Sequence, residues 1–280
     1  MTQGTGTYYD RLSRWTAVAR FLGYGGGRDT LTVHRALADP DAGGAPTPTR
    51  VHELLVASLP PLTAPRVLDA GCGLGGTLLH LASRLGGSCT GLTLSEQQAR
   101  IAREAAARAG LQDQIDIHVR SYDSPPEQHF DLIVAIESLA HSPDPATSVR
   151  ALASRLAPGG VIAIVDDKPE AAAQGTRDLE LFKSGWRLPV LWGSDRYHQA
   201  LREHGLTPLA NHDLTPHVRP RSLARIRRLE LLNRIAHRIV PSEGFRAMLD
   251  SYHGGLALER LYRQALMKYR LLIAQRLQVA

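Results

Sequence analysis

The chain has 280 residues, of which 43% are hydrophobic, and a formal net charge of +6. Because no run of about 18 apolar residues occurs, the sequence predicts no transmembrane helix and no membrane insertion. The first residues are neither basic nor strongly apolar, so no signal peptide is expected. The two cysteines, Cys72 and Cys89, lack zinc-finger spacing, so we expect reduced thiols in the cytoplasm and no metal site.

Short apolar runs alternate with helical patterns after a loop rich in Pro and Gly at 40–48. The runs predict strands at 66–70, 89–93, 114–119, 130–136 and 161–165, and two late strands at 206–215 and 268–275. Helices are expected at 78–85, 95–109 and 147–156, and 219–264 is expected to be mainly helical. This order predicts an α/β fold with a doubly wound, mostly parallel sheet, whose ligands bind at the carboxyl ends of the strands.

A glycine-rich turn directly follows the first predicted strand, where residues 69–76 read Asp-Ala-Gly-Cys-Gly-Leu-Gly-Gly. Gly71, Gly73 and Gly76 satisfy the G-x-G-x-x-G pattern, which makes NAD a competing ligand. However, the charge of Asp69 would repel a pyrophosphate. A dinucleotide site also needs an acid at the end of the second strand, where this chain has Thr93. Both residues favour a cofactor that carries an amino acid.

Four stretches together resemble class I S-adenosylmethionine-dependent methyltransferases. Residues 69–76 resemble their motif I, and 156–160 (Leu-Ala-Pro-Gly-Gly) resemble the turn before their fifth strand. Residues 91–98 are similar to the T-L-S-x-x-Q stretch of cyclopropane-fatty-acid synthases and of sterol, tocopherol and prenyl-diphosphate methyltransferases. Residues 135–141 resemble the end of the fourth strand in the same group. The resemblance implies a Rossmann-like fold that binds S-adenosylmethionine.

The resemblance also implies three regions and a set of cofactor-binding residues. The regions are an N-terminal helical lid (1–60), the cofactor-binding core (61–168), and cap helices with the final strands (169–280). The glycines would hold the cofactor by backbone contact, and Asp69 would orient its methionine part. The implied cofactor-binding residues are Asp69, Gly71, Cys72, Gly73, Gly75, Thr93, Leu94, Gln98, Ser121, Tyr122, Asp123 and Glu137.

Other side chains are candidates for catalysis or acceptor binding. Glu137 and His141 follow the fourth strand, beside the expected point of methyl transfer, and a histidine can act as a base near neutral pH. The aromatic segment 182–197 would cover an apolar acceptor or a cationic intermediate. The predicted acceptor-binding residues are Tyr8, Tyr9, Tyr24, Ser138, His141, Trp186, Trp192 and Tyr197.

The favoured function is C-methylation of an isoprenoid or terpenoid portion of a small natural product. O-methylation with His141 as the base is the main alternative, because attack by a hydroxyl needs a base and attack by an alkene does not. Pro189 stands where the prenyl-diphosphate enzymes have a glutamate base, which argues against a diphosphate acceptor. An RNA-modifying protein and a cofactor-binding protein without transfer activity are the remaining alternatives.

The segment from Arg196 to Arg246 is basic, with ten arginines and four acids. Within it, arginines alternate with leucines and isoleucines at helical spacing, as in 223–232. We therefore expect an amphipathic helix that packs on a cap or on a second subunit, so that a homo-oligomer is compatible with the sequence. We expect no nucleic-acid binding from it.

Overall fold

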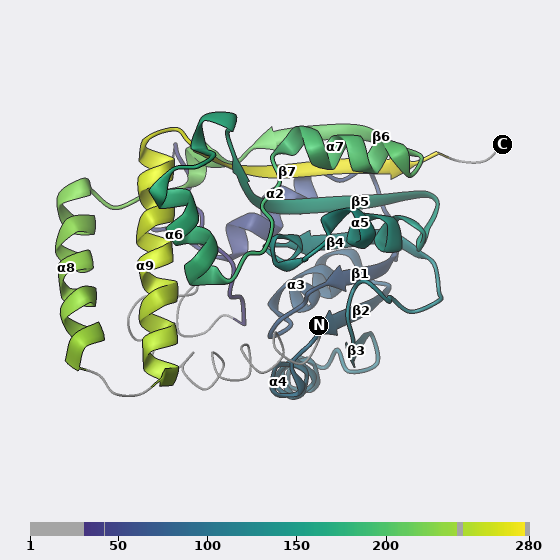
Figure 1. Cartoon of the computed structure of the whole chain (residues 1–280). Coiled ribbons are helices and arrows are strands. Elements are labelled where there is room, and N and C mark those ends of the chain that lie inside the picture. Colours follow the sequence, from purple (N-terminus) through teal and green to yellow (C-terminus); the bar gives the residue numbers. More distant parts are fainter. Residues whose placement is uncertain (1–30, 42, 240–242, 278–280) are drawn as a thin grey trace.

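A seven-stranded sheet in the order β3-β2-β1-β4-β5-β7-β6 forms the middle layer of the molecule (Figure 1). The structure is a computed structural model and describes residues 31–41, 43–239 and 243–277. The strands are β1 (Arg66–Ala70), β2 (Ser88–Thr93), β3 (Ile115–Val119), β4 (Phe130–Ile136), β5 (Leu156–Pro169), β6 (Leu206–Asp213) and β7 (Met267–Arg276). The α-helices are α2 (Thr49–Ser58), α3 (Gly76–Leu85), α4 (Glu96–Arg108), α5 (Pro145–Ala153), α6 (Arg177–Trp186), α7 (Ser194–Glu203), α8 (Leu223–Ile239) and α9 (Glu243–Arg263).

Strands β1 to β5 run parallel, and β7 pairs antiparallel with both β5 and β6. The prediction of a doubly wound, mostly parallel sheet is therefore confirmed. Several boundaries were wrong, among them the end of the fifth strand, which was expected at residue 165 and lies at Pro169. The helix expected at 147–156 is α5, which begins at Pro145 and ends at Ala153. The expected turn at 156–160 belongs to the start of β5, where its pairing with β4 shifts register between Phe130 and Leu132.

Neighbouring residues of the central strands face opposite sides of the sheet and so build two cores. Leu132 and Val134 of β4 pack in the core that also holds side chains of α2, α3, α4, α6 and α9. Ile133 and Ala135 pack on the other side, with side chains of α5 and α7. This alternation is the two-residue period of a strand, and apolar residues on both faces are typical of a buried parallel sheet.

The N-terminal region is described from residue 31 onward, so about half of the predicted lid (1–60) lies outside the described residues. Residues 31–37 are not helical, and a backbone pairing of Leu37 with Thr47 closes the predicted loop. Helix α2 packs on α3 and contributes Val51 and Leu55 to the core. Among the described residues, none of the helices has both the length and the hydropathy to cross a membrane.

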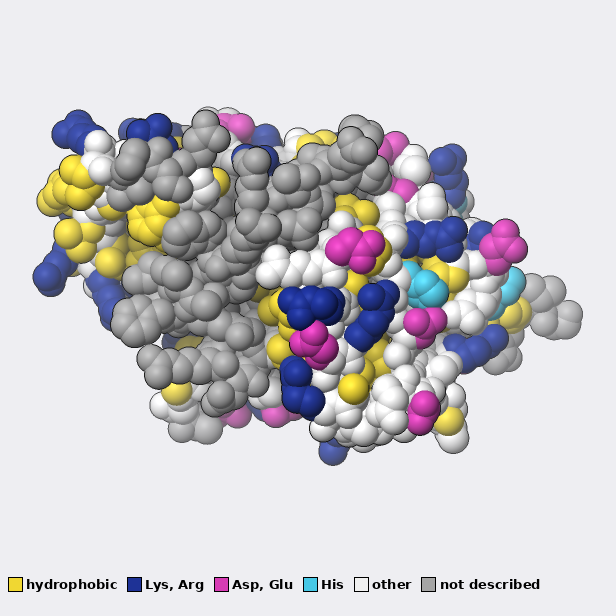
Figure 2. Space-filling view, turned by 90° about the horizontal axis from the view of Figure 1, so that it is seen from below, with side chains coloured by type: hydrophobic (Ala, Val, Ile, Leu, Met, Phe, Trp, Pro, Cys, Tyr) yellow, Lys and Arg dark blue, Asp and Glu magenta, His cyan; other side chains and the backbone are white. Residues whose placement is uncertain are grey.

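Helices α6, α9 and α8 lie side by side at one end of the molecule (Figure 1). Helices α6 and α9 approach closely where α9 has a glycine. A Cβ on Gly254 would lie only 3.1 Å from the Leu181 carbonyl oxygen of α6. Dark-blue and yellow side chains gather at this end in the view from below (Figure 2). The long helix α8 contacts the rest of the described molecule mainly through α9.

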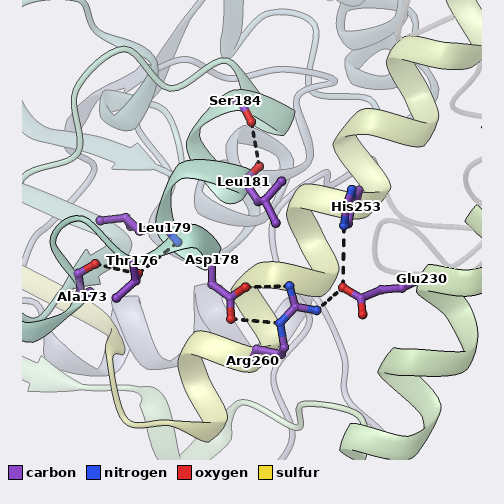
Figure 3. A network of polar contacts seen from close by, with 9 residues as sticks. All are labelled: Ala173, Thr176, Asp178, Leu179, Leu181, Ser184, Glu230, His253 and Arg260. Atoms are coloured by element: carbon purple, nitrogen blue, oxygen red, sulfur yellow. Dashed lines mark hydrogen bonds and ion pairs between the residues drawn. The ribbon is translucent and has the colours of Figure 1, made fainter. Parts of the chain in front are cut away.

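One arginine joins the three helices (Figure 3). Arg260 of α9 forms a two-pronged ion pair with Asp178 of α6, with distances of 2.7 and 2.9 Å. Its third nitrogen donates to the carboxylate of Glu230 on α8, which also lies 3.7 Å from the ring of His253. A bidentate pair fixes orientation as well as distance, so α6, α8 and α9 are held in one arrangement.

Candidate functional site

A cavity of about 540 Å³ opens at the carboxyl ends of the parallel strands. It is lined by the turn after β1, by residues that follow β2, β3 and β4, and by Asp166 and Asp167 of β5. Residues 31–35 cover one side, and Phe182 and Trp186 of α6 with Leu258 of α9 form another wall. The topology thus places the cavity where the sequence predicts the ligand site.

The glycine-rich turn allows the chain to pass close to its neighbours. Gly71 has a φ of +112°, and a Cβ there would lie 2.5 Å from the Cβ of Ser138. Gly73 has a φ of +52° and lines the cavity, and a Cβ there would meet only Val33, at 3.4 Å. The lining also includes Cys72. The turn therefore brings bare backbone to the cavity.

Gly75, in contrast, does not line the cavity. Its φ is +86° at the residue before α3, and a Cβ there would lie 2.9 Å from the Cβ of Ala102 on α4. The position of Gly75 serves the packing of α3 against α4, and its expected backbone contact with the cofactor stays a prediction. Fold geometry explains this glycine without any ligand.

Asp69 is the next-to-last residue of β1 and lines the cavity. It is 2% exposed, and its Oδ2 has no hydrogen-bond partner among the described residues. Burial raises the pKa of this carboxyl to about 7. A buried polar atom without a partner costs free energy, so Asp69 is a natural contact for a polar or cationic group in the cavity.

Three predicted residues after β2 lie together on the cavity wall. The hydroxyl of Thr93 donates to Oε1 of Gln98 at 2.8 Å, and both side chains are buried. Ser95 caps α4 as predicted, because its Oγ accepts from the backbone N–H of Gln98 at 3.1 Å. Leu94 also lines the cavity. Because the hydrogen bond from Thr93 uses the amide oxygen of Gln98, the amide nitrogen of Gln98 can donate to a different acceptor.

The residues after β3 form the next part of the wall. Ser121, Tyr122 and Asp123 all line the cavity. The hydroxyl of Tyr122 donates to the carbonyl oxygen of Ser138 at 3.3 Å, and burial raises the pKa of the phenol. Asp123 accepts a hydrogen bond from the hydroxyl of Ser148 at 2.5 Å.

Glu137 occupies the end of β4 in a left-handed conformation, with a φ of +48°. Its Oε1 accepts from the backbone N–H of Arg35 at 3.0 Å and from the hydroxyl of Tyr269 at 2.8 Å. Burial raises its pKa to about 7, although the charge of Arg35 opposes this shift. Non-glycine residues in this backbone region are strained and cluster at functional sites.

The other candidates after β4 also face the cavity. Ser138 is buried, and its Oγ has no hydrogen-bond partner among the described residues. His141 ends a short 3-10 turn and lines the cavity. Burial lowers the pKa of His141 to about 4, so its imidazole is neutral at pH 7.

The sequence analysis missed three charged residues at this site. Asp166 accepts from the backbone N–H of Ala140 at 3.2 Å, and burial raises its pKa to about 6. Asp167 pairs with Arg35 at 3.4 Å and accepts from the hydroxyl of Tyr262. The signal for the two aspartates was present, since they follow an apolar strand at the ligand-binding edge. No local pattern points to Arg35.

The predicted aromatic residues separate into three groups. Trp186 lines the cavity. Trp192 and Tyr197 instead pack in the core under α7, with ring centroids 5.3 Å apart, and do not line the cavity. The expectation that they face an acceptor does not fit these positions. Tyr197 also lies beneath the ammonium group of Lys168, which is 3.6 Å from the ring centroid. Tyr8, Tyr9 and Tyr24 lie outside the described residues.

The chain is similar in sequence to enzymes named for methyl transfer. The profile of a family described as "Methyltransferase domain" matches residues 21–211. The 27-O-demethylrifamycin SV methyltransferase of Amycolatopsis mediterranei is 30% identical over 213 residues, 73% of this chain and 76% of that protein. The chloroplastic tocopherol O-methyltransferase of Arabidopsis thaliana is 34% identical over 165 residues, 55% of this chain. The match spans 47%, about half, of the plant protein.

Two solved structures share the fold over most of the chain. The [4+2]-cyclase SpnF aligns with a TM-score of 0.77 and 20% identity, covering 100% of this chain and 98% of that one. A geranyl diphosphate methyltransferase, in complex with its diphosphate and sinefungin, aligns with a TM-score of 0.70 and 22% identity. That alignment covers 89% of this chain and 91% of the other.

Proposed function

The chain belongs to the methyltransferase domain family, whose methyl donor is S-adenosylmethionine, and we propose that it methylates a hydroxyl oxygen of a small, largely apolar natural product. One observation carries the choice of a hydroxyl. His141 lines the cavity, and burial lowers its pKa to about 4, so its imidazole is neutral at physiological pH and has the protonation state of a proton acceptor.

The cavity fits the cofactor at several points. S-adenosylmethionine supplies a methyl group bound to a positively charged sulfur, together with an ammonium group and an adenosine. Asp69 offers a buried carboxylate oxygen that has no hydrogen-bond partner in the described part of the chain, and Gly71 and Gly73 bring backbone without side chains to the same place. In our proposal Asp69 and these glycines hold the amino-acid part, Thr93 and Gln98 contact the ribose, and Ser121, Tyr122 and Asp123 contact the adenine.

The acceptor would bind between the turn after β4 and the α6–α9 wall. Phe182, Trp186 and Leu258 give this part of the cavity an apolar surface. Apolar walls exclude water, which strengthens the interactions of any charge that develops inside. The same walls can align an acceptor oxygen with the methyl group, and alignment of this kind is a major part of the catalysis of a direct displacement.

His141 accepts the hydroxyl proton as the oxygen attacks, and the imidazole becomes a cation. Asp166 fixes the turn that carries His141 by accepting from the N–H of Ala140, the residue before it. Asp166 and Glu137 line the same cavity as His141. In this mechanism His141 is the catalytic base, and Asp166 is a positioning residue.

Carbon methylation of an isoprenoid portion is the second candidate, and a specific feature of the cavity favours it. Attack by an alkene needs no base and leaves a carbocation. The rings of Trp186 and Phe182 and the carboxylates of Glu137 and Asp166 line one cavity and would stabilise such a cation. The O-methyl name of the Arabidopsis relative supports the hydroxyl reading instead.

The deciding experiment is methyl transfer from cofactor labelled with a heavy isotope in the methyl group. Two acceptor sets would be offered, phenolic or macrocyclic natural products with free hydroxyls, and terpenoid alkenes without them. Mass spectrometry with fragmentation locates the label on oxygen or on carbon. Label on oxygen supports the proposal. Label only on carbon contradicts it and establishes the second candidate. Tight NAD binding without binding of the demethylated cofactor would contradict both the O-methylation and the C-methylation proposal.

A further inference from the structure

The outer face of α8 carries a stripe of apolar side chains. The stripe consists of Leu231, Leu232, Ile235 and Ile239, which are between 48% and 73% exposed. On a helix with 3.6 residues per turn these positions fall within an arc of about 100°. A stripe of this width is what a helix normally buries, yet no other described element covers it.

The opposite face of α8 already has its partner. Ile226 is fully buried, and the amide of buried Asn233 donates to the Leu249 carbonyl oxygen of α9 at 3.2 Å. The only acid of α8, Glu230, points to the same side, where it pairs with Arg260 (Figure 3). The exposed stripe is therefore a second apolar face, in addition to the one that holds α8 on α9.

Five arginines flank the stripe. Arg225, Arg227, Arg228, Arg234 and Arg238 are all exposed on α8. With Glu230 turned inward, the outer face of the helix carries no carboxylate. Figure 2 shows apolar and basic side chains intermingled at this end of the molecule. Exposed leucine and isoleucine between arginines is the pattern of a helix that lies in the headgroup region of a bilayer.

Charge decides between the partners that could cover this face. In a two-fold contact between two copies, the same patch meets itself, so each set of five arginines would face the other. The first thirty residues of this chain carry four arginines and two aspartates, so their charge does not complement the patch either. An anionic lipid surface supplies both the missing negative charge and an apolar layer for the stripe.

We propose that the stripe and arginines of α8 dock the protein on anionic lipid bilayers, with the helix parallel to the membrane plane. This membrane binding is independent of the proposed O-methylation. It also gives the arrangement of helices a use, because α9, against which α8 packs, contributes Leu258 to the cavity wall. An apolar acceptor dissolved in the membrane would then be close to the enzyme.

Vesicle flotation tests the proposal on the full chain. Vesicles of phosphatidylcholine with about 30% phosphatidylglycerol should bind the protein, and pure phosphatidylcholine vesicles should bind it at least ten-fold more weakly. Each basic residue near an anionic surface contributes about five-fold, so the double variant R227Q/R234Q should lose about 25-fold. The control R84Q/R202Q removes the same charge from exposed arginines on α3 and α7 and should lose less than three-fold.

A second pair of variants tests the apolar contribution. Ile235→Gln removes a stripe residue that is 48% exposed, and Leu209→Gln removes an equally exposed residue, at 47%, on β6. Only Ile235→Gln should weaken binding to anionic vesicles. Equal losses for stripe and control variants would show non-specific charge attraction and overturn the proposal. Two other results would also overturn it. One is light scattering that shows a dimer for the wild type and a monomer for I235Q, and the other is stronger binding to tRNA than to vesicles at physiological salt.

Discussion

The hydroxyl of Tyr269 donates a 2.8 Å hydrogen bond to Oε1 of Glu137, so the antiparallel strand β7 supports the strained end of β4. The same oxygen accepts from the backbone N–H of Arg35, 102 residues away in sequence. Glu137 therefore ties the segment that covers the cavity to the sheet beneath it.

Tyr269→Phe should destabilise the protein and raise the pKa of Glu137 further. The hydrogen bond from Tyr269 favours the ionised carboxylate, and its loss leaves Arg35 as the remaining donor described for Oε1. A hydrogen bond to a charged group contributes about 1.5–3 kcal/mol. Urea unfolding of the variant and the wild type at pH 8 measures the loss. Equal stability of the two proteins would contradict this role.

Asp69→Asn should abolish cofactor binding and yet stabilise the cofactor-free protein at high pH. Burial raises the pKa of Asp69 from 3.8 to about 7. A carboxyl whose pKa is raised by folding adds stability that is complete below the unfolded pKa and is lost as pH rises through the folded one. The wild type should therefore lose stability between about pH 4 and 7, and the Asn variant should lose less.

Melting temperatures of both proteins at pH 5 and pH 8, with and without the demethylated cofactor, test this pair of effects. The gap between the two proteins should open at pH 8, and only the wild type should be stabilised by the cofactor. If the variant is stabilised by the cofactor as strongly as the wild type, Asp69 does not contact it.

Gly73→Val should leave the chain folded and remove cofactor binding. Gly73 lines the cavity, and the only neighbour of a Cβ there among the described residues is the side chain of Val33, at 3.4 Å. Gly110→Val is the matched control, because Gly110 also has a positive φ, +69°, and open space around it. Both variants pay the backbone cost of a side chain at positive φ. In calorimetry, only Gly73→Val should lose binding, and retained binding would place Gly73 outside the cofactor site.

His141→Gln should lower kcat for a hydroxyl acceptor by about 10²–10⁴, the usual contribution of a general base. Cofactor affinity should stay within a few-fold, because other residues hold the cofactor in our proposal. Stopped-assay turnover and calorimetric cofactor binding give the two numbers. An unchanged kcat would remove His141 as the base and favour attack by carbon.

The two tryptophans should respond in opposite ways to substitution by leucine. Trp186 lines the cavity, so Trp186→Leu should raise the KM for the acceptor with a small effect on stability. Trp192 packs in the core against Tyr197, so Trp192→Leu should cost about 2–4 kcal/mol of unfolding free energy with an unchanged KM. The reverse pattern would contradict their placement.

Much of the fold was readable from the sequence, because parallel strands are apolar throughout and short loops follow them. Strands β1 and β4 begin and end at the predicted residues, and Ser95 caps its helix as expected. Residues at or just after the carboxyl ends of strands, such as Asp69 and Glu137, could be found because topology gathers these ends at one edge of the sheet.

Other features depend on contacts that no local pattern records. Arg35 reaches Asp167 across 132 residues of sequence, and nothing near Arg35 announces that pairing. Trp192 and Tyr197 lie in an aromatic stretch with Trp186, but which side of the sheet each faces depends on the path of the chain between α6 and α7. Aromatic content alone therefore predicted an aromatic wall of the cavity correctly for Trp186, but it also assigned two core residues to that wall.

The ion pairs of Arg260 with Asp178 and Glu230 connect the proposed membrane-binding helix α8 with the helix α6 of the cavity wall. Asp178 and Glu230 share this one guanidinium, so α8 and α6 are connected through Arg260, and α6 carries Trp186 in the cavity wall. Coupling free energies are reciprocal. If attachment of α8 to a membrane raises the affinity for the acceptor by some factor, a bound acceptor raises the affinity of α8 for the membrane by the same factor. The enzyme would then stay longest on membranes that contain its acceptor.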